Sequence, residues 1–113
     1  MTTATSDNPD GTIDLRNLAE TKLFSPFTLR GITMPNRIVI SPMQMYAARD
    51  GLANDWHLAH LAKFAIARAG LIFTEVLCVE ARGRNTHWDC GIWSDDHVAP
   101  LRRIADLLRQ CGA

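Results

Sequence analysis

Hydrophobic and polar residues divide the chain into a polar start and a longer apolar part. Residues 1–21 are rich in Thr, Asn and Asp, and their branched aliphatic side chains are only Ile13, Leu15 and Leu18. Such a small apolar surface cannot offset the conformational entropy that these residues would lose on ordering. We therefore predict a disordered N-terminal tail over residues 1–21. Apolar density rises from residue 22, and we predict one domain over residues 22–113.

Short apolar runs predict a hairpin and two strands. The alternating runs at 27–29 and 32–34 lie on either side of a glycine-containing turn and predict a small β-hairpin. The β-branched run at 37–41 is followed by a proline, which cannot donate to a sheet, and it predicts the first buried strand. Residues 71–79 are apolar almost throughout, which is typical of a parallel strand covered by helices on both faces.

Capping signals and helical periodicity predict two helices. Asn54 or Asp55 can cap a helix over about 56–69, and Gly70 is expected to end it in a left-handed conformation. A second helix is predicted over about 98–111, because its apolar residues fall on one half of the helical wheel. The order strand, helix, strand, helix predicts an α/β fold with right-handed crossovers.

The balance of charge narrows the possible partners. Lys and Arg total 12, Asp and Glu total 12, and neither sign is clustered. Such a chain lacks the basic surface that nucleic acid or an anionic membrane requires, so we predict neither as a partner and expect a small molecule or a protein. The N-terminus does not resemble a signal peptide, no run is long enough to span a membrane, and the three cysteines form no CxxC pair. We therefore predict a cytoplasmic protein without a disulfide framework.

Candidate chemistry lies in the segments that follow the two predicted strands, because ligands of parallel α/β folds bind beyond the carboxyl ends of the strands. Residues 41–46, SPMQMY, offer backbone N–H groups, the Gln44 amide, the Tyr46 phenol and two thioethers that can pack against a flat aromatic ligand. The alternative is a strand-end loop whose methionines fill core space. Glu75 lies inside an apolar strand and must either be paired or point into a polar site.

A small zinc domain is a further alternative. His57 and His60, and likewise His87 and Cys90, are three residues apart, a spacing that structural zinc sites also use. On the helical wheel the first two histidines lie opposite most of the apolar side chains, so they are expected on the outer face of the helix or as caps of its first turn. Four ligands divided between a helix and a loop need a fold that brings them together, and we predict no metal site.

Six segments together resemble the N-terminal part of the Old Yellow Enzyme family of FMN-dependent NAD(P)H:flavin oxidoreductases and ene-reductases, especially its bacterial thermostable-type branch. In chain order these segments are LFSPF at 23–27, PNRIVISPM at 35–43, WHLAH at 56–60, GLI at 70–72, GR at 83–84 and GIWSDDH at 91–97. The resemblance covers residues 23–113. It implies an eight-stranded TIM barrel closed at its bottom by a hairpin, of which this chain would hold the hairpin and the first two βα units.

The resemblance also implies a cofactor site. In the family, FMN lies at the carboxyl ends of the strands, so the residues expected to bind it are Ser41, Pro42, Met43, Gln44 and Val76. Tyr46 matches a catalytic-site tyrosine near the substrate. Gln44 departs from the family, which has Cys or Thr there, and Val76 stands where Ala is usual. Gln44 can hydrogen-bond the flavin but has no thiol chemistry, so the potential and redox sensitivity of the flavin are expected to differ.

The resemblance further implies that most of the site is missing. The family takes its substrate-binding His or His/Asn pair, its proton-donating tyrosine and its phosphate site from later strands. We therefore expect an N-terminal fragment, inactive alone, of an enzyme that transfers hydride from NAD(P)H through FMN to an activated alkene such as an enone. The alternative is a non-enzymatic half-barrel module that self-associates through exposed edges and apolar helix faces.

Overall fold

The computed structural model describes residues 21–113, so the predicted tail lies outside the described residues except for Thr21. The strands and helices, in chain order, are β1 (Phe27–Leu29), β2 (Ile32–Met34), β3 (Val39–Ile40), α1 (Asp55–Ile66), β4 (Leu71–Ile72) and α2 (Val98–Gln110). Within residues 21–113, short 3-10 segments occur at Lys22–Phe24, Ala81–Gly83 and Asp95–His97. None of the helices within residues 21–113 has the length and apolar character needed to cross a bilayer.

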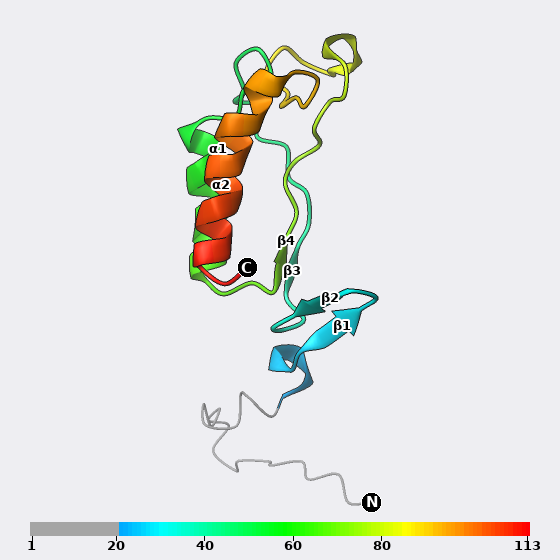
Figure 1. The fold of residues 1–113 in the computed structure, drawn as a ribbon, viewed down its shortest axis with the longest axis vertical. Coiled ribbons are helices and arrows are strands. Elements are labelled where there is room, and N and C mark those ends of the chain that lie inside the picture. The colour runs from blue at the N-terminus through cyan, green and yellow to red at the C-terminus, as the bar shows by residue number, and fades with distance from the viewer. Residues whose placement is uncertain (1–20) are drawn as a thin grey trace, which may run out of the picture.

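The predicted hairpin is present. β1 and β2 pair antiparallel, with Phe27 opposite Met34 and Leu29 opposite Ile32. Both strands are short because nothing pairs with their outer edges within residues 21–113. Figure 1 shows the hairpin at the foot of the β3/β4 pair, at the end of the described chain away from the long loops.

β3 and β4 form a parallel pair joined through α1, as the predicted order of elements requires. Val39 lies opposite Leu71 and Ile40 opposite Ile72. The strand predicted over 71–79 is therefore much shorter than expected, because a strand persists only where neighbouring chain accepts its hydrogen bonds. The prediction that both of its faces are covered is also wrong for the described chain, since Val76 is 60% and Val79 76% exposed.

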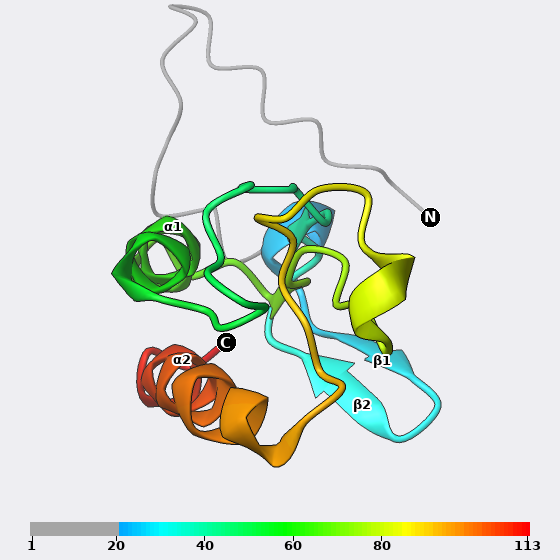
Figure 2. The same cartoon turned by 90° about the horizontal axis from the view of Figure 1, so that it is seen from above.

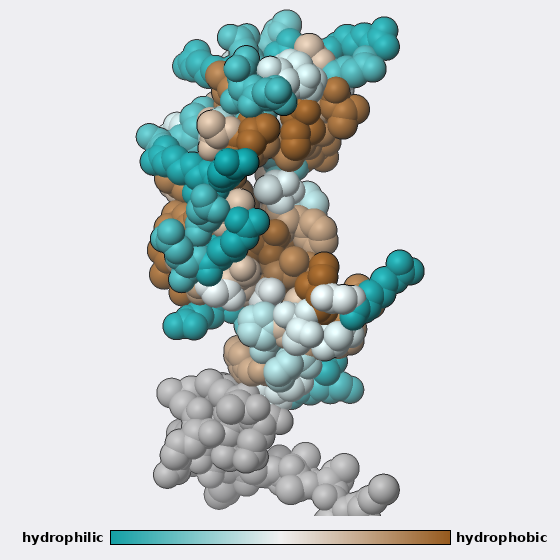
Figure 3. Space-filling view, viewed as in Figure 1, coloured by the Kyte–Doolittle hydropathy of each residue, from teal (hydrophilic) through white to brown (hydrophobic). Residues whose placement is uncertain are grey.

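Both helices cover one face of the strand pair. Seen from above in Figure 2, α1 and α2 lie next to each other on the same side of the extended segments. Their contact encloses the core, whose buried members are Ala48, Ala53, Leu61, Cys90 and Ile104. The predicted second helix is confirmed to within a residue, and polar side chains cover its outer side in Figure 3.

The end of α1 differs from the prediction. The helix stops at Ile66, and the residue in the left-handed conformation is Arg68, with φ 63°, instead of Gly70. Gly70 serves a different purpose, because a Cβ placed there would lie 2.4 Å from the backbone oxygen of Asn36. The glycine is needed for a close approach between two chain segments.

The start of α1 confirms one of the two predicted caps. Asn54 Oδ1 accepts the Trp56 N–H at 3.0 Å, and His57 Nδ1 accepts the Asn54 N–H at 3.1 Å. This reciprocal arrangement is a capping box with histidine in place of the usual Glu or Gln. His57 thus caps the first turn, and its expected alternative position on the outer face is wrong because the residue is 3% exposed.

Candidate functional site

The segments that follow β3 and β4 lie side by side. The Met45 N–H donates to Glu75 Oε2, and this hydrogen bond joins the two segments directly. Farther along, Cys78 forms an isolated parallel bridge with Gly91. In Figure 1 these loops gather at the end of the molecule opposite the hairpin, which is the carboxyl end of both strands.

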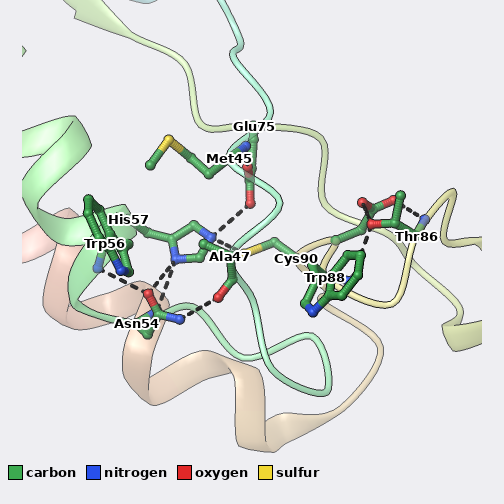
Figure 4. A network of polar contacts seen from close by, with 10 residues as sticks. Met45, Ala47, Asn54, Trp56, His57, Glu75, Thr86, Trp88 and Cys90 are labelled. Atoms are coloured by element: carbon green, nitrogen blue, oxygen red, sulfur yellow. Dashed lines mark hydrogen bonds and ion pairs between the residues drawn. The ribbon is translucent and has the colours of Figure 1, made fainter.

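A buried polar group of three residues, here called the Glu75 cluster, consists of His57, Glu75 and Cys90 (Figure 4). His57 Nε2 lies 3.0 Å from Glu75 Oε1 and 3.2 Å from Cys90 Sγ. The three residues are 3%, 6% and 1% exposed. In the tautomer whose Nδ1 accepts the Asn54 N–H, the Nε2–H of His57 donates to Glu75 Oε1. Of the two predicted alternatives for Glu75, a paired carboxylate or one that points into a polar site, the structure shows pairing with His57.

Burial and hydrogen bonding act in opposite directions on the pKa of Glu75. Burial would raise it, because a carboxylate loses hydration, but hydrogen bonds from His57, Cys90 and Met45 outweigh burial and lower the pKa below its ordinary value. Burial, followed by the neighbouring Glu75 carboxylate, raises the pKa of the Cys90 thiol far above its ordinary value. At neutral pH Glu75 is therefore ionised, and Cys90 is a thiol without the nucleophilicity of a thiolate.

The predicted zinc alternative is not supported by the positions of its ligands. Within residues 21–113, the group of possible metal ligands whose donor atoms lie within 4.8 Å of one another is His57, Glu75 and Cys90. His60 and His87 do not belong to it, and His87 is exposed, so the four-ligand site is wrong. Inside the Glu75 cluster the imidazole donates to the carboxylate and the thiol stays protonated. The three groups therefore satisfy one another by hydrogen bonds.

An apolar cavity of about 260 Å³ is lined by α1, α2 and the segments after β3 and β4. Leu61, Leu101 and Ile104 are among its walls, and the Glu75 cluster also borders it. His60 lines it too, with a buried Nε2 that has no partner within residues 21–113. Burial and then the charge of Lys63 lower the pKa of His60, so its imidazole is neutral at pH 7. The cavity therefore offers mainly apolar surface, with the ionised Glu75 as a charged group in its lining.

Most of the residues predicted to bind flavin or substrate lie on an open surface. Met43, Tyr46 and Val76 are 39%, 55% and 60% exposed, and Ser41 and Pro42 are exposed as well. Gln44 differs, because it is half-buried and its buried Nε2 faces the Asp89 carboxylate instead of the open surface. Figure 3 shows apolar residues gathered over the extended segments and the loops at their ends. The structure thus brings the two predicted loops together at one edge.

Sequence reasoning missed Asp89, which organises the loop after β4. Its carboxylate accepts the Asn85 N–H at 2.7 Å, the Thr86 N–H at 3.2 Å and the Thr86 hydroxyl at 2.7 Å, and the residue is 1% exposed. These bonds, with that of the Thr86 hydroxyl foremost and a further contribution from Gln44, hold the pKa of Asp89 below its ordinary value although burial acts to raise it. The signal in the sequence is the Thr86-x-x-Asp89 spacing, which is typical of turns closed by side chains.

Two βα units whose loops meet at the carboxyl ends of a parallel strand pair are the repeating pattern of an α/β barrel. Comparison with known proteins identifies the family. The sequence model of the NADH:flavin oxidoreductase / NADH oxidase family matches residues 22–113, and the chain belongs to this family. An NADPH dehydrogenase of Geobacillus sp. (strain WCH70) is 49% identical over 96 residues. An NADH:flavin oxidoreductase of Gibberella zeae is 42% identical over 102 residues.

Solved structures agree with the sequence comparison. The Old Yellow Enzyme from Pichia sp. AKU4542 matches with a TM-score of 0.76 and 25% identity, over 85% of this chain and 25% of that one. Morphinone reductase in complex with tetrahydroNAD matches with a TM-score of 0.73 and 24% identity, over 82% and 25%. The two curated relatives are covered over 28% and 24% of their length by 83% and 90% of this chain. The chain therefore spans about a quarter of its relatives and forms part of a TIM barrel, which confirms the resemblance seen in its motifs.

Proposed function

We propose that this sequence is the N-terminal part of an FMN-dependent NAD(P)H oxidoreductase of the ene-reductase type. The hairpin and the two βα units would be the bottom and the first quarter of a (β/α)8 barrel. When bound, FMN supplies the redox chemistry, taking a hydride from NAD(P)H and passing it from N5 to an activated alkene such as an enone. Residues 1–113 alone are proposed to be inactive, and the cytoplasmic location stays a prediction.

A row of unpaired donors is the observation that carries this proposal. The backbone N–H groups of Met43, Gln44 and Val76 make no hydrogen bond within residues 21–113. These donors lie beside an exposed thioether at the ends of adjacent strands. Such a surface suits a flat aromatic ring with acceptor atoms along one edge, so the residues present fit FMN.

Each predicted residue then has a proposed role. Ser41 and Pro42 carry the chain past the ring, and Met43 packs against it. Gln44 donates an amide N–H to the edge of the ring, where relatives use Cys or Thr. The backbone of Val76 contacts the ring from the second strand, and its side chain narrows the space beside it. Tyr46 faces the substrate, where its hydroxyl can donate a hydrogen bond to the alkene's activating group.

The experiment compares residues 1–113 with the extended protein, which is this chain expressed together with the coding sequence downstream of it. We expect the extended protein to be yellow and to oxidise NAD(P)H in the presence of an enone, while residues 1–113 do neither. Gln44→Ala in the extended protein should shift the flavin spectrum, whereas Gln110→Ala, which is exposed on α2, should not. An extended protein without flavin absorbance would sink the proposal.

A second candidate is the self-associating half-barrel module. It is favoured by large apolar side chains that remain exposed in the hairpin and in the segment after β4, including Ile32 at 64% and Val79 at 76% exposure. Light scattering after size-exclusion chromatography of residues 1–113 tests it. We expect dimers or larger assemblies if the chain works as such a module, and a well-folded monomer would contradict it.

A further inference from the structure

Tyr46 has a backbone conformation that its own side chain does not explain. Its φ of 53° lies in the left-handed region, which costs a residue other than glycine about 1–2 kcal/mol. The side chain is 55% exposed, so packing of the ring contributes little to hold it there. The conformation must therefore be imposed by the backbone on either side of Tyr46.

The residues immediately before and after Tyr46 each make a hydrogen bond to another part of the fold. Before it, the Met45 N–H donates to Glu75 Oε2. After it, the Ala47 carbonyl accepts the Asn54 side-chain amide at 2.6 Å. Because one partner follows β4 and the other caps α1, the peptide units on both sides of Tyr46 are fixed to rigid elements of the fold.

The two flanking bonds belong to one connected network (Figure 4). His57 donates to Glu75 Oε1 through Nε2 and accepts the Asn54 N–H through Nδ1, at 3.0 and 3.1 Å. His57 and Glu75 are both buried, so neither side chain can turn away without losing a desolvated hydrogen bond. The network therefore holds Met45 and Ala47 at a fixed separation, and this sets the direction in which Tyr46 leaves the backbone.

We propose that Glu75, supported by His57 and Asn54, is a positioning residue that holds Tyr46 in its left-handed conformation and so places the phenol for the substrate. The proposal rests on the proposed function, because it assumes that Tyr46 faces the substrate. Glu75 itself lies in the wall behind the loop and acts through the Met45 N–H. It differs from a purely structural buried carboxylate in that its loss must change the kinetics of the substrate step.

The test uses three variants of the extended protein. Glu75→Leu removes the acceptor of the Met45 N–H, whereas Glu75→Gln keeps a carbonyl oxygen for it. Its NH₂ can donate to His57 Nε2 once the imidazole carries its proton on Nδ1, which lies 3.1 Å from the acceptor Asn54 Oδ1. Asn54→Asp keeps a cap oxygen for α1 but replaces the donor to Ala47, and it serves if Glu75→Leu does not fold. We expect Glu75→Leu or Asn54→Asp to raise KM for the enone and to lower kcat/KM about tenfold, and Glu75→Gln to stay close to the parent.

A matched control separates positioning from stability. Asn36 is also a buried polar side chain with two backbone partners, the Arg68 carbonyl at 2.8 Å and the Ile38 N–H at 3.0 Å, but it lies at the opposite end of β3. Asn36→Leu should lower the melting temperature without changing KM. If Glu75→Leu behaves in the same way, or lowers kcat/KM equally in a Tyr46→Ala background, the proposal is overturned.

A crystallographic measurement distinguishes failure of this inference from failure of the proposed function. If the parent extended protein has no flavin and no NAD(P)H oxidation, the proposed function fails on its own. The φ of Tyr46 in crystals of the parent and of Glu75→Leu still decides the positioning role. Loss of the left-handed conformation in the variant supports the inference, and its retention overturns it.

Discussion

Gly70→Ala should strongly destabilise the extended protein, because it forces apart two of the segments that resemble the family. The new Cβ would lie 2.4 Å from the Asn36 backbone oxygen and 2.7 Å from Asn36 Oδ1. An ordinary contact needs about 1 Å more. The backbone oxygen cannot swing away like the end of a flexible side chain, so either β3 or the end of the α1–β4 connection must move.

The magnitude follows from what that movement would break. Overpacking of this kind costs about 1–3 kcal/mol. The Gly70 N–H donates to the Ile38 carbonyl at 2.9 Å, and the Asn36 amide donates to the Arg68 carbonyl at 2.8 Å. Losing or stretching these two bonds adds about 1 kcal/mol. The expected loss in the free energy of unfolding is therefore about 2–4 kcal/mol, since alanine recovers less than 1 kcal/mol through the unfolded chain.

Urea unfolding of the extended protein measures this loss. With a slope of about 2 kcal/mol/M, the midpoint should fall by about 1–2 M. Gly83→Ala is the matched control, because a Cβ there meets nothing within 4 Å, and its midpoint should stay within about 0.3 M of the parent. Equal midpoints for Gly70→Ala and Gly83→Ala would refute the close approach between Gly70 and Asn36.

Three further predictions concern the site and its loops. In acid, the folded state should lose stability through Glu75 and Asp89. The pKa of each carboxyl is lower in the folded chain than its ordinary value, which is 4.5 for Glu75 and 3.8 for Asp89. The stability that each carboxylate contributes is therefore complete above the ordinary pKa and is lost as the pH falls through the lowered pKa of the folded state. Urea midpoints measured from pH 7 to pH 3 should therefore fall in the acid range, and less steeply for Glu75→Gln. Cys90, buried and held as a thiol, should react with maleimide only after unfolding, whereas the half-buried Cys111 should react first, as peptide mass mapping would show. Ser94→Ala should lower the free energy of unfolding by about 1 kcal/mol in the same urea assay, because Ser94 Oγ accepts the Asp96 N–H at 3.3 Å and so caps the 3-10 segment Asp95–His97 that leads into α2.

Local signals were sufficient to predict the elements, and long-range contacts explain where prediction failed. The hairpin, α2 and the Asn54 cap depend on residues close together in the sequence, and each was predicted correctly. In the Glu75 cluster, His57 contacts Glu75, 18 positions later, and Cys90, 33 positions later. No local sequence pattern predicts contacts at such separations. The helical wheel places His57 on the outer face of its helix or at its first turn, because the wheel takes account only of neighbours along the same helix.

Gly70 is a second case in which a local signal predicts the wrong role because a long-range contact decides it. A glycine after a helix predicts a left-handed cap, yet Arg68 takes that conformation two residues earlier. Gly70 is instead required by Asn36, which is far away in the sequence and belongs to another of the family motifs. Two motifs that were read as separate signatures are thus the two sides of one contact.

The apolar stretch at 71–79 is not fully covered by the described residues. A strand with one solvated face would show alternation, but this stretch is apolar on both faces while α1 and α2 cover only one. Val76 and Val79 are consequently exposed, on residues whose composition is typical of a barrel interior. This composition is typical of a strand that has neighbours on both faces. In the extended protein proposed above, further strands would cover Val76 and Val79, and a crystal structure of that protein would show the loss of their exposure.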